Sequence, residues 1–325
     1  MAVSEIQAST WENRSKKPSD LVSDNVPLMW FLRKKGKVVT IPGGRVIWEN
    51  ARYQQNNYVQ RIDATQEMVI GYNDTLTAFE YSPKIMIVPV VINELEKAQN
   101  QGEARFVSLL IERNQTADDS LINNVEQDLQ GDGTGYGGKA FAGIQTYIVT
   151  STSSGSYGGL SRATYSSIRN VAVNAPTTFT GITDSSNIES RLRYVKNQIV
   201  RGTDKPTLCL AGQTYFNAAG DSMSAKQRFT QDKETYEAGF DNIVIEGMVM
   251  VNAGGKSFSG LSRIADDRAY LINLDNFAFK MYSGYNFQPI AQRTSFNQLV
   301  DCSINLGIGQ FTCNGSSLSV VMYDS

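Results

Sequence analysis

The feature that most constrains the fold is one long amphipathic helix in the first half of the chain. Asn100 followed by Glu103 approximates a helix capping box, and Gly131 and Gly133 stand where such a helix would end. From residue 103 to 129 the helix would be about 40 Å long at ~1.5 Å per residue. One apolar stripe predicts that one face packs on a sheet. Its members are Phe106, Leu110, Ala117, Leu121, Val125 and Leu129.

Ahead of this helix, the sequence predicts a projecting β-hairpin. Val46 and Trp48 alternate with polar neighbours, residues 75–81 alternate again, and the polar stretch 54–57 lies between them. An isolated two-stranded ribbon is only marginally stable in water, so the hairpin makes sense if it lies on a neighbouring subunit. A disordered loop is the alternative, but the segment is too aromatic for that. After the hairpin, residues 85–88 predict a buried strand.

The segment before the hairpin, residues 1–37, predicts an N-terminal arm. Its apolar cluster at 28–32 is closed by three cations and a glycine at 33–36. Cations in the last turn and a glycine after it are typical of a helix C-terminus. A basic patch that touches packaged DNA or a scaffold protein is the alternative.

Histidine is absent from the 325 residues, which removes several classes of catalytic site. There is no Ser-His or Cys-His nucleophile pair and no imidazole metal ligand. The three cysteines at 209, 302 and 313 are too widely spaced for zinc and suit reduced thiols. Adjacent acids at 118–119 and 266–267 point in different directions, so we interpret them as solvated surface. We expect no catalytic residues, no cofactor and no metal.

Charge and hydropathy set further limits. The net charge of -2 argues against a dedicated nucleic-acid binder. The first residues lack the basic and apolar regions of a signal peptide, and the longest apolar run, 85–92, is too short to span a bilayer. We expect a soluble cytosolic protein with no membrane contact.

Two glycine-rich stretches imitate nucleotide-binding loops. Residues 133–138 satisfy G-x-G-x-x-G but follow a helix end, whereas the dinucleotide fingerprint follows a strand. Residues 254–257 resemble the end of a Walker loop, but Met250 occupies the place of its first glycine. We reject both as cofactor loops and expect the first to be a flexible link between domains.

From residue 140 to 274 the pattern changes to alternating helices and strands. Ile188, Leu192, Val195 and Ile199 predict one amphipathic helix. Strands are predicted at 207–211, 243–245, 248–251 and 269–272, and residues 277–323 are strand-rich.

Two motifs in this region resemble those of a known family. The first is GGLSRATY at 158–165, which runs on to Arg169, and the second is EAGFDNIVIEG at 237–247. Two glycines permit a tight turn, and Arg162 and Arg169 offer guanidinium forks for carboxylates. In order and wording, the motifs resemble the A-domain signatures of tailed-phage major capsid proteins with the Hong Kong 97 fold. Residues 205–210 and 227–229 do so as well, and the similarity covers most of the chain.

The resemblance implies an α+β fold with a discontinuous domain. An N-terminal arm would occupy residues 1–37, and the E-loop with its approach strands 38–83. A P-domain would take 84–138, with the long helix as its spine, and return at 275–325 with the C-terminal strands. The A-domain, 139–274, would be inserted between its two parts. Assembly contacts would come from Trp48, Tyr53, Tyr58, Arg61, Tyr72, Arg162 and Arg169.

The implied function is that of a major capsid protein, which self-assembles as pentamers and hexamers into an icosahedral head around phage DNA. Its partners would be a separate scaffold protein, a portal, a decoration protein and, non-specifically, the packaged DNA. Its place would be the virion, after assembly in the cytoplasm of the bacterial host. An encapsulin-like nanocompartment shell is the first alternative, and a carboxylate-based hydrolase is the second. The arm and hairpin favour a shell, because a monomeric catalyst would leave both exposed.

The family's type member joins its subunits by an isopeptide bond between an E-loop lysine and an asparagine of a neighbour. This chain has no lysine between Lys37 and Lys84, and an arginine stays protonated. We therefore expect a shell that is held non-covalently. The missing histidines likewise predict that acid-driven expansion would occur below about pH 5.5, unless burial shifts a carboxylate.

Overall fold

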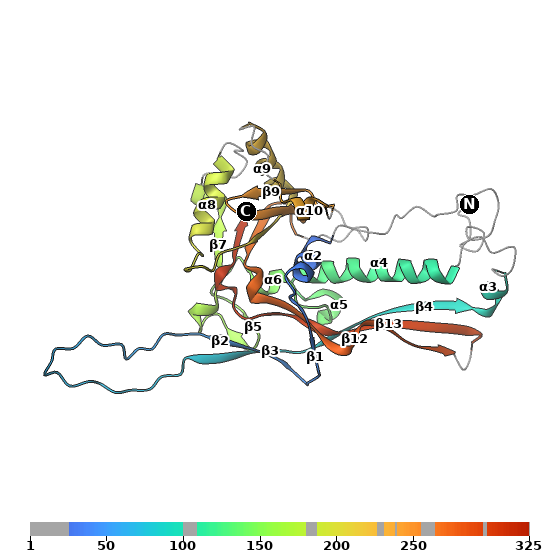
Figure 1. Ribbon diagram of the computed structural model, residues 1–325, viewed down its shortest axis with the longest axis horizontal. Coiled ribbons are helices and arrows are strands. Elements are labelled where there is room, and N and C mark those ends of the chain that lie inside the picture. The colour runs from blue at the N-terminus through green and yellow to red at the C-terminus, as the bar shows by residue number, and fades with distance from the viewer. Residues whose placement is uncertain are drawn as a thin grey trace.

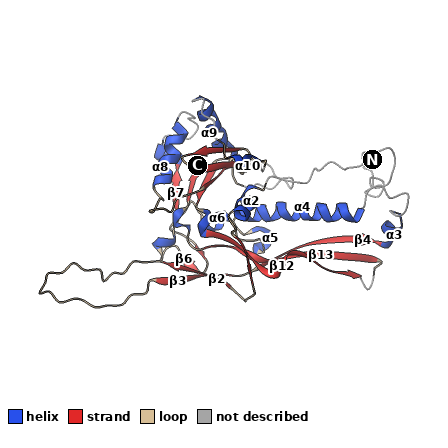
Figure 2. Ribbon diagram, viewed as in Figure 1, coloured by secondary structure: helices blue, strands red, loops and turns tan. Residues whose placement is uncertain are grey.

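The structure is a computed structural model that describes residues 26–99, 109–179, 187–225, 231–237, 239–254, 264–294 and 298–324. It consists of two main sheets, flanking helices and one long projecting hairpin (Figure 1). The hairpin points away from the body on the side opposite to the longest helix (Figure 1). Helices and strands are mixed throughout the chain, so the predicted α+β class is confirmed (Figure 2).

The four-stranded sheet has the order β1–β12–β13–β4. Strands β12 (Phe277–Thr294) and β13 (Val300–Cys313) form its long antiparallel centre. Strand β4 (Lys84–Asn93) pairs antiparallel with β13, and β1 (Val38–Ile41) pairs parallel with β12. The sheet therefore joins a segment near the start of the chain to its last fifty residues.

Strand β4 includes the predicted strand at 85–88, but the prediction that this strand is buried is wrong. Ile85 is 63% exposed and Ile87 is 57% exposed, while Val90 and Ile92 are buried. The physical reason is that successive side chains of a strand point to opposite faces, and only one face of this edge strand is covered.

The longest helix, α4 (Leu109–Gln130), packs against β4 (Figure 1). Its 22 residues give a length of about 33 Å at ~1.5 Å per residue. Ala117, Leu121, Val125 and Leu129 are all buried, which confirms these four members of the predicted stripe. The predicted start of the helix, with Asn100, Glu103 and Phe106, lies outside the described residues. A short helix, α3 (Glu94–Gln99), follows β4.

Helix α2 (Pro27–Lys34) ends as predicted, with cations in its last turn and Gly36 at a φ of 64°. Leu28 and Leu32 are completely buried, so this end of the predicted arm is part of the core. The fully buried carboxylate of Glu126 on α4 accepts the backbone N–H groups of Leu28 and Met29, each at 2.8 Å. Glu126 thereby satisfies N–H groups at the start of α2 that have no partner within the helix.

The six-stranded sheet has the order β7–β14–β11–β8–β10–β9. Its strands coincide with the predicted ones at 207–211, 243–245, 248–251 and 269–272, with two additions at its other edge. The strands are β7 (Val171–Asn174), β14 (Val320–Tyr323), β11 (Arg268–Ile272), β8 (Leu208–Ala211), β10 (Met248–Asn252) and β9 (Asn242–Ile245).

The last strand of the chain, β14, pairs with β11 and β7 in this second sheet. The resemblance grouped the C-terminal segment with the strands next to the long helix, and that expectation fails for β14. The 3₁₀ turn at Ser316–Leu318 separates it from β13, so the chain passes from one sheet into the other. Residues 320–323 therefore add to the sheet of the inserted segment.

The central strand β8 is buried on both faces and joins two cores. Leu208 and Leu210 belong to the core shared with α4, β12 and β13. Cys209 and Ala211 belong to a second core, which α8 (Ile188–Asn197) and α9 (Gln213–Ala225) cover. The predicted stripe from Ile188 to Ile199 is buried in this second core, and α9 is a helix that the pattern analysis missed.

Short elements complete the chain. The hairpin strands are β2 (Ile47–Arg52) and β3 (Leu76–Tyr81), and a smaller pair is β5 (Ser156–Tyr157) with β6 (Leu160–Ser161). Single turns of helix lie at α5 (Gly135–Gly138), α6 (Ile144–Tyr147), α7 (Ala175–Phe179) and α10 (Lys233–Glu237), with further 3₁₀ turns at Ser166–Ile168 and Leu274–Asn276. The glycine-rich stretch at 133–138 thus lies between α4 and α6, as a link.

Candidate assembly surface

The projecting hairpin is a regular ladder only at its root. Strands β2 and β3 pair from Ile47 opposite Tyr81 to Arg52 opposite Leu76. Beyond them, side-chain amides connect the two arms of the loop 53–75.

Gln60 donates to the carbonyl of Val69 at 2.6 Å and accepts its N–H at 3.1 Å. Gln54 donates to the carbonyl of Asp74, and Asn73 donates to that of Gln55. Side-chain amides on both arms thus bond to backbone groups of the opposite arm, which connects the arms beyond the paired strands.

The loop presents large apolar side chains to solvent. Ile70 is 90% exposed and Tyr72 is 85% exposed, and several neighbours on the loop are also largely uncovered. Contiguous exposed apolar surface of this kind marks an interaction site in a folded protein. The other exposed apolar members are Tyr58, Val59, Ile62, Met68 and Val69.

The GGLSRATY motif holds the root of the hairpin against the body. Its two glycines have positive φ angles of 55° and 77° and form the turn between β5 and β6. The carbonyl of Gly158 accepts the N–H of Glu80 on β3, and a Cβ at Gly158 would lie 2.7 Å from that of Phe79. Phe79 in turn stacks on Tyr157 with ring centroids 5.2 Å apart. Only a residue without a side chain allows this approach.

The two arginines of the motif bind backbone carbonyls, and the expectation that they hold carboxylates is wrong for the described fold. Arg162 donates to the carbonyls of Thr146 and Tyr147 at 2.8 and 3.1 Å, and it lies over the ring of Tyr157. Arg169 donates to the carbonyls of Arg162 and Ala163. Arg162 is only 2% exposed, so it supports the motif from inside, whereas Arg169 is half-buried.

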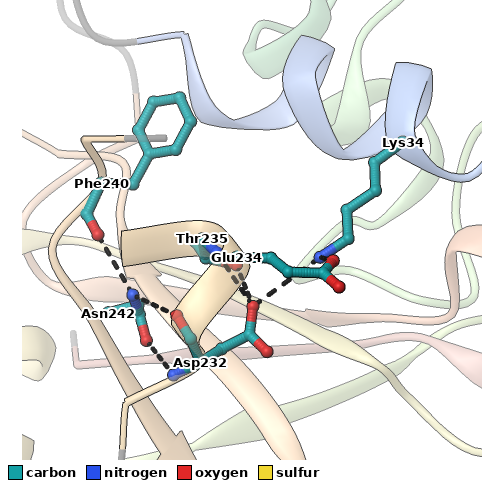
Figure 3. A network of polar contacts seen from close by, with 6 residues as sticks. All are labelled: Lys34, Asp232, Glu234, Thr235, Phe240 and Asn242. Atoms are coloured by element: carbon teal, nitrogen blue, oxygen red, sulfur yellow. Dashed lines mark hydrogen bonds and ion pairs between the residues drawn. The ribbon is translucent and has the colours of Figure 1, made fainter. Parts of the chain in front are cut away.

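The second motif and α10, which ends at the first residue of the motif, together contact α2 (Figure 3). Asn242 accepts the N–H of Asp232 and donates to the carbonyl of Phe240, which fixes the loop around α10. Lys34 of α2 reaches this loop and pairs with Glu234 at 2.7 Å. Trp30 of α2 meets the ring of Phe240 at 5.6 Å. Each family-like motif thus fixes one of the two segments expected to reach other subunits.

The predicted contact residues of the hairpin occupy different positions. Trp48 is 57% exposed on β2, and Arg61 and Tyr72 are exposed on the loop. Tyr53 is half-buried against Tyr165, at a ring separation of 5.3 Å, so it supports the root. Tyr58 lies across the hairpin from Gly71, where a Cβ would meet its ring.

A cavity of about 330 Å³ lies between β4, α4 and residues 136–141. Asp128 of α4 is 7% exposed on its wall, and one carboxylate oxygen accepts the N–H of Phe141 at 3.1 Å. Burial raises the pKa of Asp128 to about 6, against the opposing effect of that hydrogen bond. Asp128 is not among the predicted site residues, although it lies seven positions after Leu121 and so falls on the buried stripe.

Two of the cysteines are buried and held as thiols. Burial raises the pKa of the Cys209 and Cys313 thiols to about 12, which disfavours the reactive thiolate. Within the described ranges, no group of three or more acidic or cysteine side chains is placed to hold a metal ion. The surface that the structure does offer is the apolar loop, the exposed face of β4 and the cavity beside it.

Comparison with solved structures identifies the fold. A capsid chain of the cyanophage A-1(L) superposes with a TM-score of 0.71 at 13% identity, covering 96% of both chains. A capsid chain of the native GTA particle gives a TM-score of 0.60 at 10% identity, covering 97% of this chain and 95% of that one. The chain has the major capsid protein fold of tailed phages.

The capsid fold also occurs in an encapsulin. The SrpI encapsulin of Synechococcus elongatus gives a TM-score of 0.56 at 9% identity, covering 94% of this chain and 91% of that one. No protein-family model matches the sequence, and no curated protein matches it either. Among the described helices of this capsid fold, none is both long and apolar enough to cross a membrane.

Proposed function

We propose that this chain is the major capsid protein of a tailed phage and self-assembles into the icosahedral shell that encloses phage DNA. The observation that carries the proposal is the projecting hairpin, whose apolar loop is left exposed by the described residues of its own chain. Ile70 and Tyr72 remain largely exposed among the described residues, and packing on a neighbouring subunit would bury this apolar surface. The capsid fold supports the same reading, because its solved examples are shells.

The contact residues proposed for assembly are Trp48, Tyr58, Arg61 and Tyr72 on the hairpin, with Arg169 on the body. Tyr53 contributes indirectly, through the root. The subunits would group as pentamers and hexamers, with a separate scaffold protein, a portal and a decoration protein as partners. Assembly in the host cytoplasm would place the protein in the virion, and the protein would have no enzymatic activity.

Particle formation tests this proposal. The purified protein, with and without a co-expressed scaffold, should form capsomers or shells in analytical ultracentrifugation and negative-stain electron microscopy. A stable monomer under every assembly condition would refute it.

An encapsulin-like nanocompartment is the second candidate, because one encapsulin shares the fold over most of the chain. The contents of particles purified from the natural source separate the two. A phage head should contain DNA and a portal protein, and a nanocompartment should contain an enzyme cargo.

A further inference from the structure

Asp128 is a buried carboxyl group that the fold leaves without a positive partner. Within the described part of the chain, its carboxylate accepts the N–H of Phe141 and forms no ion pair. Ionising a carboxyl group in such a place is unfavourable unless a cation compensates it. The raised pKa of Asp128 reflects this same burial.

The cavity beside Asp128 has a mixed lining that suits a cation on an apolar stem. Its walls are mostly apolar, and a few polar groups, Asn124, Tyr136 and Lys139, also line it. A guanidinium on a three-carbon chain would place its stem on such walls and its charged end on the carboxylate. The apolar lining residues are Ile85, Met86, Ile87, Val88, Ala140 and Phe141.

Arg61 is a cation with the complementary properties. It is exposed on the hairpin loop and makes no hydrogen bond or ion pair within the described residues. Its apolar neighbours Val59 and Ile62 are exposed as well, at 72% and 43%. Arg61 thus carries a positive charge between apolar neighbours, opposite in sign to the carboxylate of Asp128 in the cavity wall.

The Arg61 of the same chain cannot fill the cavity. The hairpin projects from the side of the molecule opposite to α4 and β4 (Figure 1). Arg61 lies nine residues beyond Arg52, the last residue of β2, which corresponds to about 30 Å of extended chain. At that distance Arg61 lies away from the body of its own chain, where a second copy can contact it.

Resting on the proposed shell assembly, we propose that Arg61 of one copy enters the cavity of a second copy and pairs with its Asp128. Val59 and Ile62 would then pack on the exposed side chains of Ile85 and Ile87. The planar guanidinium fork matches a carboxylate in two parallel hydrogen bonds. One contact would cover both the uncompensated carboxylate and part of the exposed apolar surface of each copy.

The pair makes assembly dependent on pH. A cation favours the ionised form of Asp128, so the contact releases a proton when it forms near or below pH 6. Assembly should therefore weaken as the pH falls below about 6. Two other cations lie close to this site: Lys139, which lines the cavity, and Lys84, which donates to the carbonyl of Gly138.

A double-mutant cycle on the full chain tests the pair. Arg61→Gln and Asp128→Asn should each raise the critical concentration for assembly at pH 7.5 by about tenfold, measured by light scattering. The critical concentration of the double variant should be no higher than that of whichever single variant assembles less well. Arg52→Gln, at the root of the same hairpin, is the matched control and should leave the critical concentration within about twofold.

The possible results separate the pair from the shell itself. Additive effects of the two substitutions would overturn the pair, as would a pH dependence that Lys139→Gln removes and Arg61→Gln leaves intact. Asp128→Asn must also retain its fold by circular dichroism and thermal melting, so that weak assembly is not mistaken for misfolding. A wild-type chain that never assembles refutes the proposed function, whereas normal assembly without coupling refutes only the pair.

Discussion

The buried carboxyl group of Asp128 predicts that the free energy of unfolding depends on pH. Replacing the carboxyl group by an amide should remove this dependence. The pKa of Asp128 is about 6 in the folded chain, against 3.8 for an unperturbed aspartate. Because the folded pKa is the higher one, the folded state binds more protons between these two pH values. The stability that protonated Asp128 contributes is fully present below pH 3.8 and is lost as the pH rises through about 6.

The size of the effect follows from the difference between the two pKa values. At 1.36 kcal/mol for each pKa unit, the difference corresponds to at most about 3 kcal/mol. The cavity is open to solvent, which screens the charge, so we expect about 1–3 kcal/mol. Asn at position 128 has the same shape and can still accept the N–H of Phe141. Asp128→Asn should therefore stabilise the subunit by that amount at pH 8 and by almost nothing at pH 4.

Urea unfolding of unassembled subunits, followed by fluorescence at pH 4, 6 and 8, measures this difference. Asp132→Asn is a matched control with the opposite sign. Asp132 accepts the N–H and hydroxyl of Thr134, and these bonds lower its pKa, so its contribution is present at high pH and lost in acid. The reasoning would be refuted if Asp128→Asn and the wild type were equally stable at pH 8. It would also be refuted if Asp128→Asn were more stable than the wild type only in acid.

Further predictions concern the hairpin, the helix cap and the motif turn. Replacing residues 54–71 by a short Gly-Ser turn should leave the melting temperature nearly unchanged but abolish shells in light scattering, since this loop adds little to the core; normal shells would contradict its role. Glu126→Ala should lower the free energy of unfolding by about 2–4 kcal/mol, because two buried N–H groups lose their acceptor; an unchanged urea midpoint would contradict this. Gly158→Ala should destabilise by about 1–3 kcal/mol, and more than Gly137→Ala, which has a positive φ but open space around it. Boiled particles should give one band near 35.8 kDa on a denaturing gel, because the hairpin carries no lysine; a ladder under reducing conditions would show covalent links.

Local periodicity predicted the helices α4 and α8 and most of the described strands, whereas most of the short helices gave no such signal. The stripe of α4 and the face of α8 are determined by contacts within one segment and the sheet below it, so spacing alone indicates them. Helix α9 was missed although Tyr215, Ala219 and Met223 recur at helical spacing and are buried. That signal was present in the sequence.

Pairing between distant segments could not be predicted in the same way. The residues of β14, Val320–Tyr323, do not indicate which sheet they join. An apolar strand of this length would fit the four-stranded sheet as well as the six-stranded one. Arg162 shows the same limit for a side chain. A guanidinium binds carboxylates and carbonyls alike, and only the fold brings the carbonyls of Thr146 and Tyr147 within reach.

The exposed face of β4 and the carboxyl of Asp128 are both unfavourable in an isolated subunit. Ile85 and Ile87 keep apolar surface in water, and Asp128 forms no ion pair with any described cation. Proteins tolerate such features where binding needs them, since stabilising substitutions at functional positions commonly reduce function. The stabilising change Asp128→Asn is therefore also the change expected to weaken assembly. A purely structural residue would move stability and assembly in the same direction, so opposite signs in the two measurements would mark Asp128 as a contact between subunits.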